Sequence, residues 1–396
     1  MKAIVMGRNY TSILGMLRCA GEAGCEITVI RTVRKMPKEK KTKWALPQVE
    51  AKSRYVEKYL YATEPDSEGL VQLLMDQCRA KDGKVILLPT DDFTASVTDL
   101  NRDLLKEYFL FPHVEERQGG IVQLMDKEQQ KKWASAAGMN VVDSWKIEYT
   151  DEGYAIPDGL PFPLFVKPEF SYLGRKGQIA RCETMEDLKQ LCGRIAQNEC
   201  CPLLAERFIR IEKEYGVVGF SDAKQVVTPI LIEKTAIGSG HHLGVTLLGK
   251  VVSMDSNPVL RDQIHQMIRG THFTGLFDID LFESEGKMYF NELNLRMGAF
   301  GYAARCAGVN LPGMLIANLT GREEKEADLA RENFLCISEK VNYEEFRSGN
   351  IGFKEMKNNL KKADAFFIRS ETDPGPWRAF RMIEARGMVR RLLKKH

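Results

Sequence analysis

GLFDIDLF, at Gly275–Phe282, is followed by the short segment ESEG and then by KMYFNELNLR, at Lys287–Arg296. Both outer runs are rich in large apolar and β-forming residues, whereas the segment between them is polar and ends in glycine. This pattern is typical of two short strands joined by a turn. The sequence therefore predicts a β-hairpin, and the polar residues inside it are the first candidates for a functional site.

The two predicted strands each carry a row of polar side chains. Because side chains alternate along a strand, Asp278 and Asp280 share one face, and Glu292, Asn294 and Arg296 share another. If the strands pair across the turn, these groups converge on one spot. Carboxylate and amide oxygens suit Mg²⁺, which takes one or two carboxylates and fills its other positions with phosphates and water. An arginine beside them can grip a phosphate or a carboxylate. A solvated hairpin with charged outward positions is the alternative.

Length and composition indicate a soluble protein of several domains. The chain has 396 residues, of which 44% are hydrophobic and 28% are charged, and it contains no long uninterrupted apolar run. Its net charge of +3 gives no indication of nucleic-acid binding. The nine cysteines are scattered without a C-x-x-C pair, as expected for reduced thiols in a cytoplasmic protein. We expect neither integral membrane association nor a nucleic-acid partner.

The first hundred residues follow a pattern of alternating strands and helices. A strand ending at Gly7 is followed by an amphipathic helix and a second strand at 26–30, which predicts a parallel sheet. The G-x-G-x-x-G glycines are absent after Gly7, which argues against a dinucleotide-binding dehydrogenase. A buried strand at 84–89 is followed by Asp91 and Asp92, at the edge where open α/β sheets bind ligands. Capping of the next helix is the alternative role for these acids.

From about residue 112 the pattern changes to mixed strands and helices. Lys127 lies at the start of a predicted helix, and 163–168 and 201–209 read as strands. A basic, glycine-containing loop occupies 169–178, and a loop with glycine and histidine occupies 238–242.

Taken in this order, the pieces resemble the ATP-grasp superfamily over roughly residues 1–320, and within it the carboxylate–amine ligases. D-aspartate ligase, D-alanine–D-alanine ligase and the carbamoyl phosphate synthetase large subunit represent this type. The resemblance implies a combined α/β and α+β fold, in which an N-terminal parallel-sheet domain precedes two α+β subdomains that clamp ATP. The expected bounds are 1–111 for the first domain, 112–200 and 201–320 for the two subdomains, and 321–396 for a helical extension.

The resemblance assigns phosphate binding to two lysines and a loop. Lys127 matches the first ATP-binding lysine, and Lys167 matches the second, which reaches the phosphates and takes part in catalysis. A compact ammonium beside a glycine loop can neutralise phosphate charge. Many members have small residues where this chain has Tyr172, Leu173 and Arg175, so a plain connecting loop is the alternative. The residues that match the phosphate loop are Ser171, Gly174, Lys176 and Gly177.

Two further matches concern adenine and ribose. The segment Glu206, Arg207, Phe208 and Ile209 resembles the hinge that hydrogen-bonds adenine through its backbone. An ordinary core strand is the alternative, since a true hinge would use main-chain atoms of such a strand. Glu214 matches the acid that binds the ribose hydroxyls, and a surface glutamate is the competing interpretation.

The predicted hairpin supplies the remaining matches. Asp280, Glu292 and Asn294 correspond to the three metal ligands of the family, and Arg296 to the catalytic arginine that stabilises the transferring phosphate. The family often has proline between the last two residues, where this chain has Leu295. The implied cofactors are ATP and one or two Mg²⁺, with Mn²⁺ as a substitute.

Three residues are weaker candidates for contact with the substrates. His241 and His242 lie in a loop that looks like the glycine–histidine segment of carbamoyl phosphate synthetase, although loop histidines are usually solvated. Gly298 follows the hairpin where ligases shape the acceptor pocket, and a turn into a buried helix is its alternative role.

The function implied is ATP-dependent ligation of a carboxylate, such as an amino acid or peptide, to an amine. The reaction would pass through an acyl-phosphate and release ADP and phosphate. Small-molecule acids and amines are the expected partners, with a homodimer as a further expectation. The alternatives are carboxyphosphate chemistry, as in carbamoyl phosphate synthetase, and a non-catalytic ATP-binding protein with the same fold.

Overall fold

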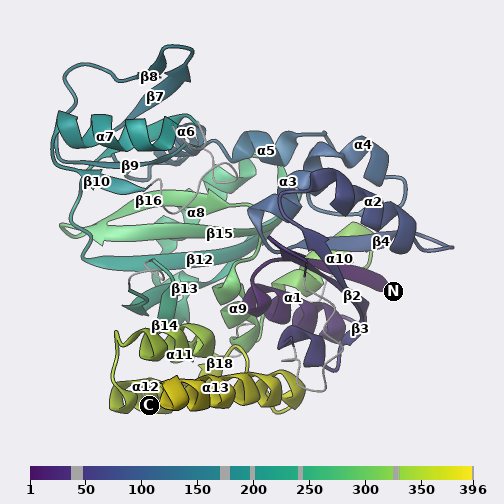
Figure 1. Ribbon diagram of the computed structural model, residues 1–396. Helices are drawn as coiled ribbons and strands as arrows, with labels where there is room; N and C mark the ends of the chain where they lie inside the picture. The colour runs from purple at the N-terminus through teal and green to yellow at the C-terminus, as the bar shows by residue number, and fades with distance from the viewer. Residues whose placement is uncertain are drawn as a thin grey trace.

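Three β-sheets organise the molecule (Figure 1). The structure is a computed structural model, with side chains described up to Gly387. It describes residues 1–36, 48–169, 179–196, 201–239, 244–323, 329 and 331–394.

The first sheet is parallel throughout and has the strand order β3-β2-β1-β4-β5. Helices cover its faces, so β1 and β4 are buried almost along their whole length, as their continuous apolar sequences require. The predicted N-terminal parallel sheet is confirmed. Its strands are β1 (Lys2–Gly7), β2 (Glu26–Val33), β3 (Val56–Thr63), β4 (Val85–Pro89) and β5 (Phe109–Leu110). Its helices are α1 (Tyr10–Glu22), α2 (Ser67–Gln77), α3 (Asp92–Leu100) and α4 (Arg102–Leu105).

The strand order reverses between β1 and β4, so their carboxyl ends form the switch point of the sheet. A Cβ atom on Gly7 would lie 2.1 Å from Thr90 Oγ1, so only glycine permits this close approach of the two strand ends. Asp91 caps α3 by accepting from the amide of Thr94 at 2.9 Å, and it also accepts from the amide of Arg8 at 2.7 Å. The capping role is therefore correct for Asp91.

The second sheet is antiparallel and has the order β10-β9-β11-β7-β8. Strand β11 hydrogen-bonds to both β9 and β7, so the predicted boundary at 200/201 would cut this sheet. We therefore place the boundary after Arg207. The strands are β7 (Ser144–Thr150), β8 (Gly153–Ala155), β9 (Leu164–Pro168), β10 (Ala180–Cys182) and β11 (Leu203–Arg207). The helices around it are α5 (Gly120–Leu124), α6 (Lys127–Ala136) and α7 (Met185–Ala196).

The third sheet has the order β16-β15-β12-β13-β14-β17-β18, and the short β6 (His113–Val114) pairs with the start of β15. Its first five strands are β12 (Lys213–Ser221), β13 (Val226–Ile237), β14 (Thr246–Ser253), β15 (Phe273–Ser284) and β16 (Lys287–Asn294). Helix α6 packs against β16, and α8 (Pro258–Arg269) packs against α6 and β13. Both helices therefore cover one face of the sheet.

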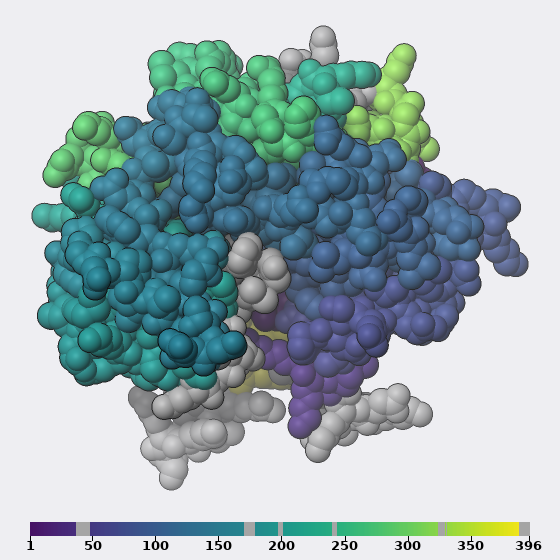
Figure 2. Space-filling view, turned by 90° about the horizontal axis from the view of Figure 1, so that it is seen from above, coloured from purple at the N-terminus to yellow at the C-terminus, as the bar shows by residue number. Residues whose placement is uncertain are grey.

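Helix α10 (Leu311–Thr320) joins the third sheet to the N-terminal domain, because it contacts both α1 and β12. One hydrophobic cluster accordingly contains Leu17 of α1, Leu315 of α10 and Phe220 of β12. The short α9 (Tyr302–Cys306) packs beside α1 in the same layer. Seen from above, the part that carries the second sheet (teal) and the N-terminal domain (purple to blue) lie on opposite sides of the molecule (Figure 2).

The C-terminal segment is not only helical, in contrast to the predicted helical extension. Strands β17 (Phe334–Ile337) and β18 (Ala365–Phe366) extend the third sheet beyond β14, because the short apolar run of β17 can bury itself on that edge. The helices of the segment are α11 (Glu339–Ser348), α12 (Phe353–Lys362) and α13 (Pro374–Lys394), along the bottom of Figure 1.

The structure bears on two expectations from composition, which concern membrane-spanning helices and the state of the cysteines. Within the described ranges, no helix combines the length and the apolar character needed to cross a membrane. Each cysteine in those ranges is free, so no disulfide joins any two of them.

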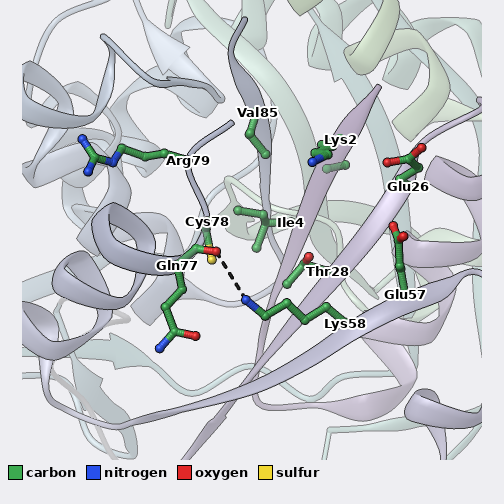
Figure 3. A pocket seen from close by; sticks show the side chains of 11 residues that line it. Lys2, Ile4, Glu26, Thr28, Glu57, Lys58, Gln77, Cys78, Arg79 and Val85 are labelled. Atoms are coloured by element: carbon green, nitrogen blue, oxygen red, sulfur yellow. Dashed lines mark hydrogen bonds between the residues drawn. The ribbon is translucent and has the colours of Figure 1, made fainter. Parts of the chain in front are cut away.

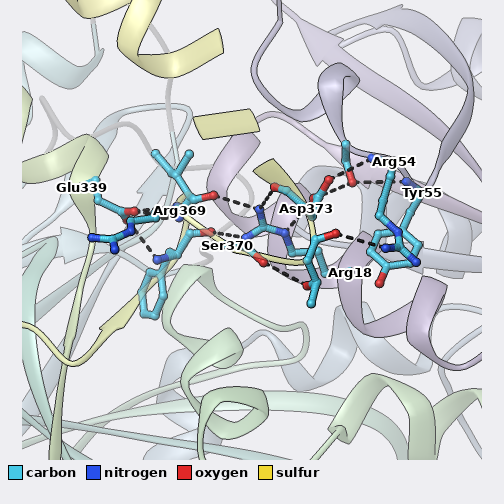
Figure 4. Close-up of polar contacts among 11 residues, drawn as sticks. Arg18, Arg54, Tyr55, Glu339, Arg369, Ser370 and Asp373 are labelled. Atoms are coloured by element: carbon cyan, nitrogen blue, oxygen red, sulfur yellow. Dashed lines mark hydrogen bonds and ion pairs between the residues drawn. The ribbon is translucent and has the colours of Figure 1, made fainter. Parts of the chain in front are cut away.

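A buried ion pair fastens the C-terminal segment to the N-terminal domain (Figure 4). Arg18 Nε of α1 lies 2.9 Å from Asp373 Oδ2, and both side chains are 1% exposed. The other nitrogens of the Arg18 guanidinium donate to the carbonyl oxygens of Phe367 and Ile368 at 2.9 and 2.8 Å. Asp373 also accepts from Ser53 Oγ at 2.8 Å. Every partner in this network comes from a distant part of the chain.

A second buried acid holds the same segment from the other side. The carboxylate of Glu339, at the start of α11, accepts the backbone amides of Phe367, Ile368 and Arg369. Burial raises the pKa of Glu339, although these hydrogen bonds oppose the shift. The chain between β18 and α13 is thus held by side chains on both sides.

We expect Arg18→Met to destabilise the protein by about 3–5 kcal/mol, because it leaves Asp373 buried without its cation. The measurement is the urea midpoint followed by fluorescence. Arg261→Met is the matched control, since Arg261 pairs with Asp255 on the surface, and it should leave the midpoint nearly unchanged. Equal midpoints for the two variants would contradict the structural role of the buried pair.

Candidate active site

The predicted hairpin forms, and its pairing brings the acidic residues together. In the antiparallel ladder of β15 and β16, Asp280 pairs with Glu292 and Asp278 with Asn294. Directly paired residues of an antiparallel sheet project from the same face. The two strands therefore present four oxygen-bearing side chains side by side.

A β-bulge modifies this pairing at the centre of the site. Asp280 pairs with Glu292 but Leu281 pairs with Phe290, which leaves Asn291 as the extra residue of β16. Bulges re-aim side chains and are common next to active sites. Here Asn291 Oδ1 accepts from Lys167 Nζ at 3.4 Å, so this amide joins the site. Strict alternation places Asn291 on the opposite face from Glu292, so no sequence signal could have identified it.

The two predicted phosphate-binding lysines reach the hairpin from different elements. Lys127 begins α6, and its Nζ lies 3.4 Å from Glu292 Oε1 and 3.2 Å from the carbonyl oxygen of Pro168. Lys167 is the penultimate residue of β9 in the second sheet, and its Nζ lies 2.9 Å from Glu206 Oε1. Their exposed fractions are only 8% and 6%. Both ammonium groups are therefore buried between the second and third sheets.

Glu206 is a bridge between two buried lysines. Its Oε1 lies 2.9 Å from Lys167 Nζ and 2.5 Å from Lys131 Nζ. Burial raises the pKa of Glu206, but Lys167 and Lys131 outweigh it and hold the pKa below its usual value. Burial lowers the pKa of Lys131. Sequence analysis missed Lys131, although its spacing of four residues from Lys127 places both on one helix face.

The remaining hinge residues offer main-chain rather than side-chain groups. The amide of Arg207 donates to the carbonyl of Asp143 at 3.0 Å, and the amide of Phe208 donates to that of Pro163 at 3.0 Å. The Arg207 guanidinium is exposed and pairs with the Asp143 carboxylate at 3.2 Å. Ile209 follows beyond the end of β11 and is partly buried.

A fourth lysine, which the sequence did not indicate, lies beside the metal-ligand candidates. Lys234 Nζ of β13 is 2.7 Å from Asp280 Oδ1 and 3.4 Å from Glu214 Oε2. Burial raises the pKa of Asp278 to about 7, and the neighbouring Asp280 carboxylate adds to the increase. Two carboxyl groups, those of Asp278 and Asp280, therefore lie close together on the first strand of the hairpin.

Arg296 connects the hairpin to the switch point of the N-terminal sheet. Its Nε lies 3.0 Å from Asp92 Oδ1, and its Nη2 donates to Asn294 Oδ1 at 3.0 Å. A Cβ atom on Gly298 would lie 2.3 Å from Asp278 Oδ2, so a larger residue there would collide with the acid. Gly298 thus borders the acidic cluster, and its proposed contact with substrate stays a prediction.

The donor set of the hairpin fits a divalent cation. Asp280, Glu292 and Asn294 supply two carboxylates and an amide, which are hard oxygen ligands. Among the described residues, no group of three or more His, Cys, Asp or Glu side chains is arranged to hold a metal ion. The predicted set relies instead on two acids and an amide.

Six predicted residues lie outside the described ranges. These are the phosphate-loop residues Ser171, Gly174, Lys176 and Gly177, and the substrate candidates His241 and His242.

A separate cavity of about 460 Å³ lies at the amino edge of the first sheet (Figure 3). Lys2, Thr28 and Cys78 are among its lining residues, and Lys58 Nζ donates to the Gln77 carbonyl at 3.4 Å beside it. Burial raises the pKa of the Cys78 thiol, so the thiolate is disfavoured. The lining includes none of the predicted site residues, and the contact of Arg296 with Asp92 lies at the opposite, carboxyl edge of this sheet.

We expect Glu206→Gln to lower the free energy of unfolding by about 3–5 kcal/mol, because two buried ammonium groups lose their shared carboxylate. Lys131→Met should lower the free energy of unfolding by a smaller amount, since Glu206 keeps its ion pair with Lys167. Urea titration of both variants and the wild type measures the order. A Lys131→Met variant less stable than Glu206→Gln would contradict the bridging role.

No protein-family model matches the chain. Over 176 residues it is 22% identical to N5-carboxyaminoimidazole ribonucleotide synthase of Staphylococcus saprophyticus, covering 44% of this chain and 45% of that protein. Over 223 residues it is 24% identical to the carbamoyl phosphate synthase large chain of Lachnoclostridium phytofermentans, covering 53% and 20%. The match therefore spans less than half the length of these curated relatives.

Solved structures match most of the chain. N5-carboxyaminoimidazole synthetase of Staphylococcus aureus, complexed with ADP, superimposes with a TM-score of 0.61 at 19% identity, covering 88% of this chain and 86% of that one. The L-amino acid ligase of Bacillus licheniformis gives 0.59 at 15% identity, covering 84% and 78%. A biotin carboxylase domain dimer of Hydrogenobacter thermophilus, bound to MgADP and bicarbonate, gives 0.60 at 16% identity, covering 84% and 73%.

These neighbours are ATP-grasp proteins, and at such identities the likeness shows the fold alone. The parallel N-terminal sheet and the two further sheets of this chain follow the same plan over more than four fifths of its length. The chain therefore has the ATP-grasp fold, as the order of its sequence motifs predicts.

Proposed function

We propose that this protein is an ATP-dependent ligase that joins a carboxylate to an amine through an acyl-phosphate. The observation that carries the proposal is the meeting of three cations on one acidic hairpin. Lys127 reaches Glu292 from α6, Lys167 reaches the bulged Asn291 from the second sheet, and Arg296 is tied to the N-terminal domain through Asp92. Buried cations beside oxygen ligands are what a triphosphate and its metal require.

ATP would lie between the second and third sheets. Lys127 and Lys167 would neutralise the phosphates, and Glu214 would accept from the ribose hydroxyls. The hinge continues β11, and the amides of Arg207 and Phe208 donate to the carbonyl oxygens of Asp143 and Pro163. The main chain of Ile209, the next residue, is therefore the part of the hinge that would bind adenine.

Asp280, Glu292 and Asn294 would hold Mg²⁺, with one or two ions as the expectation and Mn²⁺ as a substitute. A divalent cation bound there would draw negative charge from the β- and γ-phosphoryl oxygens. The chain's own part is to keep two carboxylates and an amide on adjacent strands in fixed register.

In the reaction, a carboxylate oxygen of the acid attacks the γ-phosphorus, and the bond to ADP breaks. The amine nitrogen then attacks the acyl carbon of the acyl-phosphate and loses a proton, and inorganic phosphate leaves. Arg296, held by Asp92 and Asn294, would stabilise the transferring phosphoryl group. Positioning and electrostatic stabilisation carry such a rate, so no nucleophilic side chain is needed.

The names of the relatives support this reaction class and keep one alternative in view. An L-amino acid ligase shares the fold, which favours an amino acid as the acid substrate. The curated relatives are a carboxyaminoimidazole ribonucleotide synthase and a carbamoyl phosphate synthase chain, which favours bicarbonate as the substrate of a carboxyphosphate reaction. Both reactions begin with attack of a carboxylate or bicarbonate oxygen on the γ-phosphorus.

Several earlier expectations stay predictions. They are the phosphate loop, the histidine contacts, the domain bounds, a homodimer, cytoplasmic location and the absence of a nucleic-acid partner. The dimer named for the biotin carboxylase domain supports the homodimer.

We expect Glu292→Gln to abolish phosphate release from Mg²⁺-ATP, because the site loses a carboxylate that both the metal and Lys127 need. Phosphate release is measured with pairs of amino acids in one arm and with bicarbonate in the other, and mass spectrometry identifies the product. Glu285→Gln makes the same charge change in the exposed hairpin turn and should keep full activity. Unchanged turnover of Glu292→Gln would refute the metal assignment. Nucleotide binding without turnover in any arm would favour the non-catalytic alternative.

We expect Arg296→Lys to lower kcat by about 10²–10³-fold while the KM for ATP changes little. A lysine keeps the charge but cannot contact Asp92, Asn294 and the phosphoryl group through one planar fork. Steady-state kinetics at saturating Mg²⁺ separates the two constants. A raised KM with an unchanged kcat would assign Arg296 to ground-state binding instead.

A further inference from the structure

Lys234 is the one lysine of β13, and it is buried in the acidic cluster with a side-chain exposure of only 9%. Its ammonium contacts the carboxylates of Asp280 at 2.7 Å and Glu214 at 3.4 Å. Glu214 belongs to β12 and Asp280 to β15, so the lysine links three adjacent strands. Neither the motifs nor the resemblance assigned this residue a role.

The sheet register places Lys234 there. Tyr215 pairs with Glu233, so Glu214 and Lys234 follow as the next neighbours across β12 and β13. In the adjoining row, Gly216 pairs with both Ile232 and Asp280. A Cβ atom on Gly216 would meet nothing within 4 Å, so no side chain of β12 stands between the lysine and Asp280. The position of the Lys234 ammonium therefore follows from the pairing of the strands and from the glycine at position 216, which has no side chain.

The carboxylates of Asp280 and Glu214 both reach the position of the Lys234 ammonium. Two carboxylates are also what Mg²⁺ takes from a protein when phosphates complete its coordination. Asp280 lies at the centre of the cluster, with Glu214 and Lys234 on one side of it and Glu292 and Asn294 of β16 on the other. The sheet therefore offers two places beside Asp280 for a cation. A divalent ion placed on the Glu214 side would stand within contact distance of the buried ammonium, and like charges so close repel strongly.

We propose that Lys234 is a built-in cation that takes the place of a second divalent ion between Asp280 and Glu214. The nucleotide site then accepts a single divalent ion, on the side of Glu292 and Asn294. This inference rests on the proposed nucleotide-binding function, and it narrows the expected one or two ions to one.

The test counts bound Mn²⁺ by electron paramagnetic resonance, with a non-hydrolysable ATP analogue at saturation. We expect about one tightly bound Mn²⁺ per wild-type chain, and about two in Lys234→Met, where Asp280 and Glu214 are released together. Lys250→Met is the matched control, because it removes an exposed lysine from the adjacent β14, where Lys250 pairs with Glu233. Its count should stay at about one.

Binding of a fluorescent ATP analogue, measured first and without the Mn²⁺ count, separates the proposed function from the proposed role of Lys234. A wild-type chain that binds no nucleotide refutes the proposed function and this inference together. A chain that binds nucleotide with two Mn²⁺, or a Lys234→Met variant that still binds one, overturns the inference alone. Weaker nucleotide binding with an unchanged count would assign Lys234 to phosphate and likewise overturn it. If Lys234→Met does not fold, Mn²⁺ is counted in Lys234→Gln instead. Two ions in that variant and one in the wild type are then the expected result.

Discussion

The pairing of β15 with β16 is the constraint on which the rest of the site depends. It sets Asp280 against Glu292 and Asp278 against Asn294, and its single bulge turns Asn291 toward Lys167. A slip of one residue would send the whole row of oxygen ligands to the other face. The buried apolar residues of both strands oppose such a slip, because they would have to move into the polar site.

Around this hairpin the molecule balances buried charge with ion pairs between strands of one sheet and with ion pairs from α6. Lys127 lies against Glu292, Lys234 against Asp280, and Lys131 and Lys167 share Glu206. Burying any of these groups alone would be costly, so each partner requires the other. The second sheet is joined to the hairpin by Lys167, which contacts Asn291, and by Lys127, which contacts both Glu292 and the Pro168 carbonyl. The same charged residues therefore form the proposed nucleotide site and stabilise the packing around it.

The N-terminal and C-terminal parts complete the frame. Asp92, at the switch point of the parallel sheet, holds Arg296, while Arg18 and Glu339 hold the chain around Asp373. Much of this could be predicted: the parallel sheet, the hairpin, the start of α6 and the capping by Asp91 all depend on local patterns. The places of β11 and β17 could not be predicted, because these strands join sheets whose other strands lie far away in the sequence.

The sequence by itself determined the hairpin, because the alternation of apolar and polar residues is a local property. The order of the motifs along the chain determined the phosphate-binding lysine candidates and the fold. Only the tertiary structure decided which charges meet. The bulge at Asn291, the sharing of Glu206 by Lys131 and Lys167, and the reach of Lys234 across Gly216 to Asp280 depend on register between strands. Register is set by packing over the whole sheet, so no single segment of sequence encodes it.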